Sequence, residues 1–257
     1  MSETIISFEQ IAKAFGSKSI YKDVSFDVRR GETLCIIGGS GTGKSVLLKM
    51  LVGLLYPDSG DIKVFGKSLI GLSNAQWLEV RKRIAMLFQG GALFDSLTVS
   101  ENIQYPLIEH QWGSLDRRKK RVAEVLEMVG LSGIEQLKPA ELSGGMRKRV
   151  ALARSIAVEP EVLLYDEPTT GLDPISIRRI NGLILHLQEE LKVTSLVITH
   201  EMPSVFTIAN RIAMLHEQRI GFVGTPQEAL EQKEPWLVDF LAGGEGILEL
   251  DGLDGQS

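Results

Sequence analysis

The sequence lacks long apolar runs, and no stretch approaches the roughly 20 residues that a helix needs to cross a bilayer. Its N-terminus lacks the basic segment followed by an apolar stretch that marks a secretory signal. The single cysteine, Cys35, excludes an internal disulfide, and its apolar surroundings predict a small core residue. We therefore expect a cytoplasmic protein that reaches a membrane, if it does, through a partner.

An excess of positive charge is also missing. The chain has 28 Lys and Arg against 33 Asp and Glu, a net charge of −5, whereas nucleic-acid-binding domains usually carry a basic face. The basic run at 116–121 has no interleaved aromatics, so we interpret it as a solvated helix face rather than a nucleic-acid contact. We find no internal repeat and no coiled-coil arm. The 257 residues, 44% hydrophobic and 24% charged, are typical of one large globular α/β domain or two small ones.

The most informative stretch that is present is rich in glycine. It fits the phosphate-binding pattern G-x-x-x-x-G-K-[ST] and reads Gly38-Gly39-Ser40-Gly41-Thr42-Gly43-Lys44-Ser45. The apolar run 33–37 predicts a buried strand before it, and 46–52 predict a helix after it. Glycines allow successive N–H groups to cradle an anion, and the helix start adds unpaired N–H groups. We expect Lys44 to reach the β- and γ-phosphates and Ser45 to ligate Mg²⁺, and the flanking elements disfavour a glycine turn that binds nothing.

Two later apolar strands end in groups suited to the same chemistry. The run 162–165 leads into Asp166 and Glu167, and the run 195–199 leads into His200. Ligands of open α/β sheets bind at the carboxyl ends of the strands, so these side chains are candidates for the same site. The simpler alternatives are an acidic surface turn for the carboxylate pair and a structural role for the histidine.

The region from about 90 to 160 has a different pattern. Helical periodicity over 99–110, 115–129 and 144–156 predicts a helical insert within the α/β core. The strand predicted before this region ends at Gln89, which on its own indicates nothing.

The N-terminal segments 4–14 and 21–28 alternate apolar and polar residues, which predicts antiparallel strands. Phe15, beside the turn between them, fits a core aromatic and an adenine-stacking ring equally well.

Together these motifs resemble the ATP-binding subunits of ABC transporters over essentially the whole chain up to about residue 241. The resemblance rests on the glycine loop, Gln89, Leu142-Ser143-Gly144-Gly145, Leu163–Glu167, Gly171-Leu172-Asp173 and His200. It implies an α/β P-loop NTPase core with an N-terminal antiparallel β-subdomain and a helical subdomain inserted at about 90–160. Residues 1–242 would form a single ABC ATPase domain, and 243–257 would form a tail that orders against a partner.

The same resemblance implies ATP and Mg²⁺ as ligands and assigns the site residues. Residues 38–45 would hold the phosphates and Phe15 would stack on adenine. Lys44, Gln89, Glu167 and His200 would be catalytic, with Glu167 as the base. Ser45, Gln89 and Asp166 would organise Mg²⁺. A second copy of the chain would complete each site with Ser143, Gly144, Gly145 and Asp173. Met146 departs from the Gln that most often ends the family signature.

A narrower resemblance lies in the stretch from 88 to 107. Phe88–Val99, Glu101-Asn102 and Pro106-Leu107 are similar to the lipid-trafficking branch of the family, the Mla-type systems of Gram-negative bacteria and the related Mce-type systems. This implies a peripheral ATPase on the cytoplasmic face of the inner membrane that helps move phospholipid between the inner and outer membranes and maintain lipid asymmetry. The implied partners are a membrane permease, a STAS-domain protein and an MCE-domain protein, with no nucleic acid.

Three alternatives remain open from the sequence. The chain could serve an importer of a polar solute such as an amino acid. It could be a soluble ABC protein acting on DNA or ribosomes, although such proteins usually carry a coiled-coil insertion or two fused ATPase halves. It could also be an inactive scaffold, which the presence of Lys44, Asp166, Glu167 and His200 disfavours.

Overall fold

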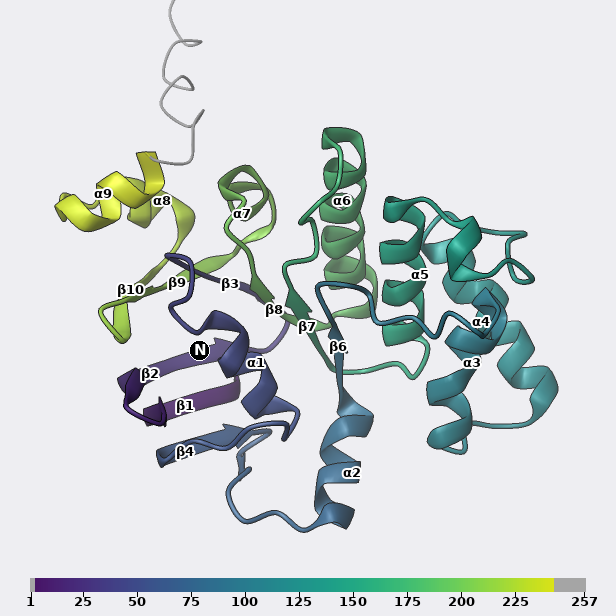
Figure 1. Ribbon diagram of the computed structural model, residues 1–257, viewed down its shortest axis with the longest axis horizontal. Coiled ribbons are helices and arrows are strands. Elements are labelled where there is room, and N and C mark those ends of the chain that lie inside the picture. The colour runs from purple at the N-terminus through teal and green to yellow at the C-terminus, as the bar shows by residue number, and fades with distance from the viewer. Residues whose placement is uncertain (1–2, 243–257) are drawn as a thin grey trace, which may run out of the picture.

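The computed structural model describes residues 3–242, so the tail predicted at 243–257 lies outside the described residues. Within them, ten strands form one sheet in the order β5-β4-β1-β2-β10-β9-β3-β8-β7-β6 (Figure 1). The strands are β1 (Thr4–Phe15), β2 (Lys18–Arg29), β3 (Thr33–Gly38), β4 (Ser59–Val64), β5 (Lys67–Ser68), β6 (Ile84–Leu87), β7 (Val162–Asp166), β8 (Thr194–Ile198), β9 (Arg211–His216) and β10 (Arg219–Gly224).

Helices connect and cover these strands. They are α1 (Lys44–Leu51), α2 (Asn74–Arg83), α3 (Val99–Glu109), α4 (Leu115–Met128), α5 (Gly144–Ile156), α6 (Pro174–Leu191), α7 (Met202–Ile208), α8 (Pro226–Leu230) and α9 (Pro235–Ala242), with a 3₁₀ turn η1 (Pro139–Glu141). The sequence patterns did not predict α7, α8 or η1, which are too short to show helical periodicity. No helix within residues 3–242 combines the length and the apolar character that crossing a membrane requires.

Five neighbouring strands of the sheet, β9, β3, β8, β7 and β6, run parallel, and β9 pairs with β3 in this direction. β3 pairs with β8, β8 with β7, and β7 with β6, all in the same direction. Every residue of β3, β7 and β8 is buried, as expected for parallel strands with helices on both faces. The carboxyl ends of these strands therefore emerge together at one edge of the sheet.

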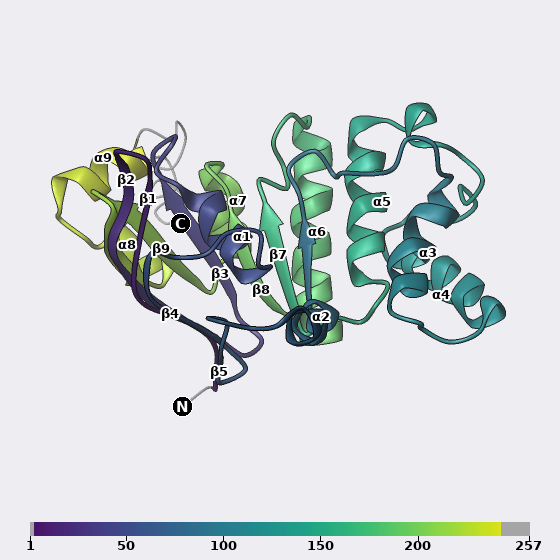
Figure 2. The ribbon, with the colours of Figure 1, turned by 60° about the horizontal axis from the view of Figure 1, so that its bottom comes forward.

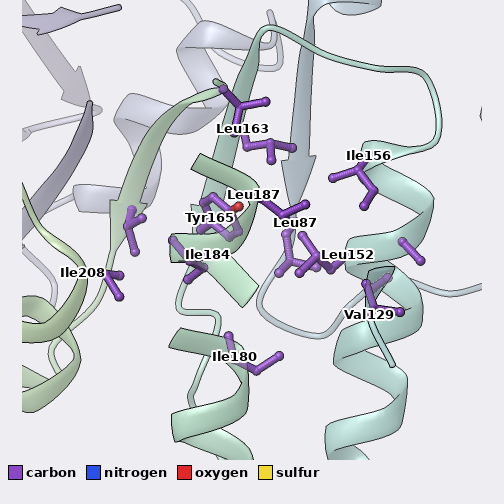
Figure 3. Packing of buried hydrophobic residues seen from close by; sticks show 14 of the residues in the cluster. Leu87, Val129, Leu152, Ile156, Leu163, Tyr165, Ile180, Ile184, Leu187 and Ile208 are labelled. Atoms are coloured by element: carbon purple, nitrogen blue, oxygen red, sulfur yellow. The ribbon is translucent and has the colours of Figure 1, made fainter. Parts of the chain in front are cut away.

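The pleat of these strands separates two hydrophobic cores. Leu163 and Tyr165 of β7 face one core, whereas Leu164 between them faces the other, because successive strand side chains point to opposite faces. Figure 3 shows Tyr165 close to Ile184 and Leu187 of α6 in the first core. Packing into the two cores therefore fixes the orientation of each strand and of the residues that follow it.

The antiparallel strands predicted at the N-terminus are confirmed. β1 pairs antiparallel with β2 and with β4, and a single parallel bridge between Arg219 and Asp23 joins β2 to β10. The sequence predicts a turn at 58–60 followed by a strand at 61–65. This turn prediction is wrong for Ser59 and Gly60, because β4 already begins at Ser59. Gly60 has φ 89°, and a Cβ there would lie 2.4 Å from the Gln10 carbonyl oxygen, so only glycine lets β4 approach the irregular part of β1.

The three helices predicted between 90 and 160 follow β6 and precede β7. In both views α3, α4 and α5 lie together at one end of the molecule, away from β1 and β2 (Figure 1 and Figure 2). Arg121, the last residue of the basic run, is buried and donates to the carbonyl oxygens of Ile156 and Ala157 at 3.0 Å, so this residue is structural. The subdomain boundaries at 1–242 and about 90–160 stay predictions.

Candidate functional site

The parallel strand ends surround an open cavity of about 680 Å³. The residues that line it come from β2, the glycine loop, the start of α1 and the ends of β6, β7 and β8. They are Ile20, Ser40, Gly41, Gly43, Lys44, Ser45, Val46, Gln89, Glu167 and His200. The structure therefore brings together residues that lie far apart in the chain but were all predicted for one site, apart from Ile20 and Val46.

The glycine loop is shaped by close contacts with β2. Gly43 has φ 99°, and a Cβ at this position would lie 2.4 Å from Cγ2 of Ile20. The Tyr21 hydroxyl donates to the Gly43 carbonyl oxygen at 2.5 Å. Gly43 is also the N-cap of α1, and no side chain caps this helix end. The first N–H groups of α1 therefore face the cavity without a side-chain acceptor, as an anion site requires.

Lys44 folds its side chain back over the loop. Its ammonium donates to the carbonyl oxygens of Gly38 at 2.9 Å and Gly39 at 3.0 Å. Burial lowers the pKa of Lys44, and the nearby carboxylates of Glu167 and Asp166 partly oppose this shift. These contacts place a buried cation beside the loop amides, where it can contact the phosphates of a nucleotide.

A short hydrogen bond joins the loop to the end of β7. The Ser45 hydroxyl donates to Oδ1 of Asp166 at 2.6 Å, and Gln89 lines the same cavity. Within residues 3–242 no three His, Cys, Asp or Glu side chains form a metal-binding cluster. Mg²⁺, however, is commonly held by one or two carboxylates together with substrate phosphates and water. The hydroxyl, carboxylate and amide oxygens at this cavity fit Mg²⁺ bound with a nucleotide.

Glu167 is held in an unusual backbone conformation. Its φ of 50° lies in the left-handed region, which costs a non-glycine residue about 1–3 kcal/mol. Its N–H donates to the carbonyl oxygen of Ile198 at 2.9 Å, and its Oε2 accepts from the Thr170 hydroxyl at 3.0 Å. The same Oε2 lies 2.9 Å from Nδ1 of His200. The carboxylate is therefore held at the cavity by partners from two neighbouring strand ends.

The predicted signature residues lie outside this cavity. Ser143 is the N-cap of α5, and its Oγ accepts from the N–H of Met146 at 3.2 Å. Asp173 is the N-cap of α6, and its hydrogen bonds with Ser176 lower its pKa. A Cβ on Gly145 would lie 2.9 Å from the Ser176 hydroxyl, so the starts of α5 and α6 are adjacent. Their assignment to the site of a second copy stays a prediction.

Phe15 also lies outside the residues that line the cavity. Its side chain is exposed, and the Lys13 ammonium lies 5.3 Å from the ring centroid. Ile20, across the turn, lines the cavity instead. The adenine-stacking role of Phe15 stays a prediction.

Besides Ile20 and Val46, two further site residues were missed from the sequence. Thr170 bonds to Glu167, and Lys148 of α5 donates to the carbonyl oxygens of Gln89 and Glu167. Lys148 could have been found from its spacing, because it shares a helix face with the buried Ala151, Leu152 and Ser155. A lysine on a buried helix face needs buried partners.

The arrangement is suited to phosphoryl transfer to water. A loop and a cation hold phosphates, hard oxygen ligands can hold Mg²⁺, and a carboxylate paired with a histidine faces the same cavity. Such reactions depend mainly on positioning and charge stabilisation, with a side chain that orients the attacking water. Hydrolysis of a nucleoside triphosphate is therefore the chemistry that this geometry supports.

Comparisons with known proteins agree with this chemistry. A family model described as ABC transporter matches residues 21–170. The chain is 39% identical over 243 residues to the intermembrane phospholipid transport system ATP-binding protein MlaF of Haemophilus influenzae, covering 95% of this chain and 92% of that protein. It is 41% identical over 258 residues to the protein trigalactosyldiacylglycerol 3, chloroplastic, of Arabidopsis thaliana, covering 94% and 74%.

The fold is likewise similar to that of a solved structure. A dimeric, post-hydrolysis ATP-binding cassette bound to ADP and Pi matches with a TM-score of 0.79 at 30% sequence identity. The match covers 86% of this chain and 98% of that chain.

Replacing the candidate base tests the site directly. We predict that Glu167→Gln lowers the rate of ATP hydrolysis about 100-fold or more, because the amide keeps the shape of the side chain but cannot accept a proton. The affinity for ATP should stay within about threefold of the original, because the phosphate-binding groups are intact. Phosphate release and equilibrium binding of a fluorescent ATP analogue would measure the two effects.

The matched control is Glu189→Gln, the same change at an exposed position of α6. It should alter neither hydrolysis nor binding. Near-normal hydrolysis by Glu167→Gln would remove Glu167 from the role of base.

Proposed function

This chain belongs to the ABC transporter family as an ATP-binding subunit, and we propose that it powers a permease that moves phospholipid between membranes. The chain hydrolyses ATP with Mg²⁺, as its family does. One observation supports phospholipid as the transported substrate, namely the 39% identity to an intermembrane phospholipid transport ATP-binding protein across 95% of the chain. Residues 88–107, which the sequence assigned to the lipid-trafficking branch, lie within this similarity.

Hydrolysis would use the groups around the cavity. The loop amides and Lys44 would bind the phosphates, and Ser45, Asp166 and Gln89 would hold Mg²⁺, which neutralises charge on the phosphate oxygens. Glu167 would accept a proton from the attacking water. His200, 2.9 Å from Glu167, would orient this water and the γ-phosphate.

Two copies of the chain would act together. Ser143 and Asp173 cap adjacent helices whose N-termini lie outside the nucleotide cavity, so they are available to the site of a second copy. A helix N-terminus favours the negative charge of phosphate. ATP would then bridge the two copies, and its hydrolysis would let them separate, which is the mechanical output.

The permease would dock beside Gln89. A second cavity, of about 350 Å³, lies between β6, α3 and α5 and includes Phe88, Phe94, Tyr105, His110 and Arg154 in its lining. Phe94 and Tyr105 are exposed, with ring centroids 4.8 Å apart. Exposed aromatic residues beside an arginine are typical of the groups that dominate binding energy at protein interfaces.

The remaining partners follow from the same branch of the family. We assign the chain to the cytoplasmic face of the inner membrane, with a STAS-domain protein and an MCE-domain protein in the complex. These assignments rest on the similarity to Mla-type systems. Nucleic acid has no place in this function, in keeping with the net charge of −5.

Phe94 provides a test of the docking surface. We predict that Phe94→Ala weakens permease binding about 30-fold, equivalent to ~2 kcal/mol, because the side chain is an exposed aromatic at the centre of the proposed contact. The recovery of permease on the tagged chain at several salt concentrations would measure the loss.

The control is Leu54→Ala, which truncates a 57% exposed leucine outside this cavity. It should leave recovery unchanged. Equal recovery with both variants would place the permease elsewhere.

Affinity purification from the native membrane in mild detergent tests the transport function. We expect a permease, an MCE-domain protein and phospholipid to co-purify with the chain. Recovery of a permease with a soluble solute-binding protein and no enriched lipid would move the substrate to a polar solute. Ribosomes or DNA in place of membrane proteins would refute the transporter function.

A further inference from the structure

A buried lysine links two strand ends of the nucleotide site. Lys148 lies on α5 and is 7% exposed. Its ammonium donates to the backbone carbonyl oxygen of Gln89 in a short contact and to that of Glu167 at 3.4 Å. One side chain thus contacts the residue that follows β6 and the residue that follows β7.

The same helix holds the rest of the chain segment after Gln89. Arg154, also on α5, donates to the carbonyl oxygens of Gly91 and Ala92 at 2.8 Å each. Three backbone carbonyls between 89 and 92 are therefore bound by cations of one helix. This segment leads directly to Phe94 in the second cavity.

Burial of the Lys148 ammonium costs free energy, because it removes the charge from water. Burial lowers its pKa, and the charges of Asp166 and Glu167 oppose this shift. A buried ammonium that donates only to carbonyls needs nearby negative charge, and the carboxylates of the nucleotide site supply it. An apolar side chain at this position would pack α5 against the sheet at a smaller cost in free energy.

We propose that Lys148 is a positioning residue that fixes Gln89 and Glu167 relative to each other and to α5. The helix carries Ser143 at its start and Arg154 near its end. A shift of α5 therefore moves the carbonyls of Gln89 and Glu167 together, and with them the metal ligand and the base. This inference rests on ATP hydrolysis at this site and is independent of the transported substrate.

Lys148→Met removes the ammonium and keeps the length of the side chain. We expect kcat for ATP hydrolysis to fall about 10- to 100-fold, because small misplacements of catalytic groups have effects of this size. KM for ATP should stay within about threefold, because Lys44 and the loop are unchanged. Lys148→Arg keeps donors for both carbonyls and should restore most of kcat.

Arg149→Met is the matched control, because Arg149 is the next residue on α5 and also donates to two carbonyl oxygens. These belong to Val129 and Gly130, at 3.0 Å each, and both lie away from the nucleotide cavity. Its loss should lower Tm and leave kcat within about twofold. If Arg149→Met lowers kcat as much as Lys148→Met, the role of Lys148 is only structural and the proposal is wrong.

A double-mutant cycle tests the link to Gln89. We compare the fall in ln kcat that Lys148→Met causes in the unmodified chain with the fall that it causes in a Gln89→Ala background. The second fall should be less than half of the first, because the effects of residues that act as a unit are not additive. Fully additive losses would contradict the proposal.

Amide hydrogen exchange separates this proposal from the proposed function. In the full-length chain, Lys148→Met should speed exchange at 87–92 and 166–170, whereas Arg149→Met should not. Unchanged exchange at both segments would overturn the role of Lys148, even if ATP hydrolysis is intact. Absence of ATP hydrolysis by the unmodified chain would refute the proposed function and leave the exchange result to decide the role of Lys148.

Discussion

The parallel pairing of β6, β7, β8 and β3 is the constraint on which the site depends. Parallel strands deliver their carboxyl ends to one edge, so residues separated by more than a hundred positions meet there. The register places Ile36 opposite Ile198 and Asp166 opposite the same Ile198. The hydrogen bond of 2.6 Å between Ser45 and Asp166 then joins the glycine loop to the end of β7. Loss of this alignment would separate the phosphate-binding loop from the carboxylates.

Charge balance explains how polar groups persist at this edge. Lys44 and Lys148 are buried cations. The negative charges of Asp166 and Glu167 favour the protonated forms of these two lysines. The two lysines contact different parts of the site, one the loop and the other the ends of β6 and β7. Side chains of α5 thus contact both the nucleotide cavity and the second cavity, which Phe94 and Tyr105 line. This is a physical route by which the nucleotide site and a docked permease would influence each other.

Much of this architecture could be predicted from the sequence, because its signals are local. The apolar run before Gly38 and the paired carboxylates after Tyr165 identify strand ends without any knowledge of the fold. What failed depends on tertiary contacts. Ser59 was read as part of a turn, although pairing with the irregular β1 makes it a strand residue. The helical spacing of Lys148 from Ala151, Leu152 and Ser155 could have indicated that it is buried, but only the fold shows which carbonyls it contacts. The short α7 and α8 carry too few residues for a periodic pattern.

ATP-dependent phospholipid transfer between proteoliposomes tests the central claim most directly, namely that hydrolysis at this cavity drives lipid movement. The chain would be reconstituted with its permease and the co-purifying lipid-binding protein, and lipid transfer and phosphate release would be recorded together. We predict that fluorescent phospholipid moves only with Mg²⁺ and ATP and in proportion to the phosphate released. Phosphate release with no lipid movement, under conditions where a polar solute is taken up, would contradict the claim.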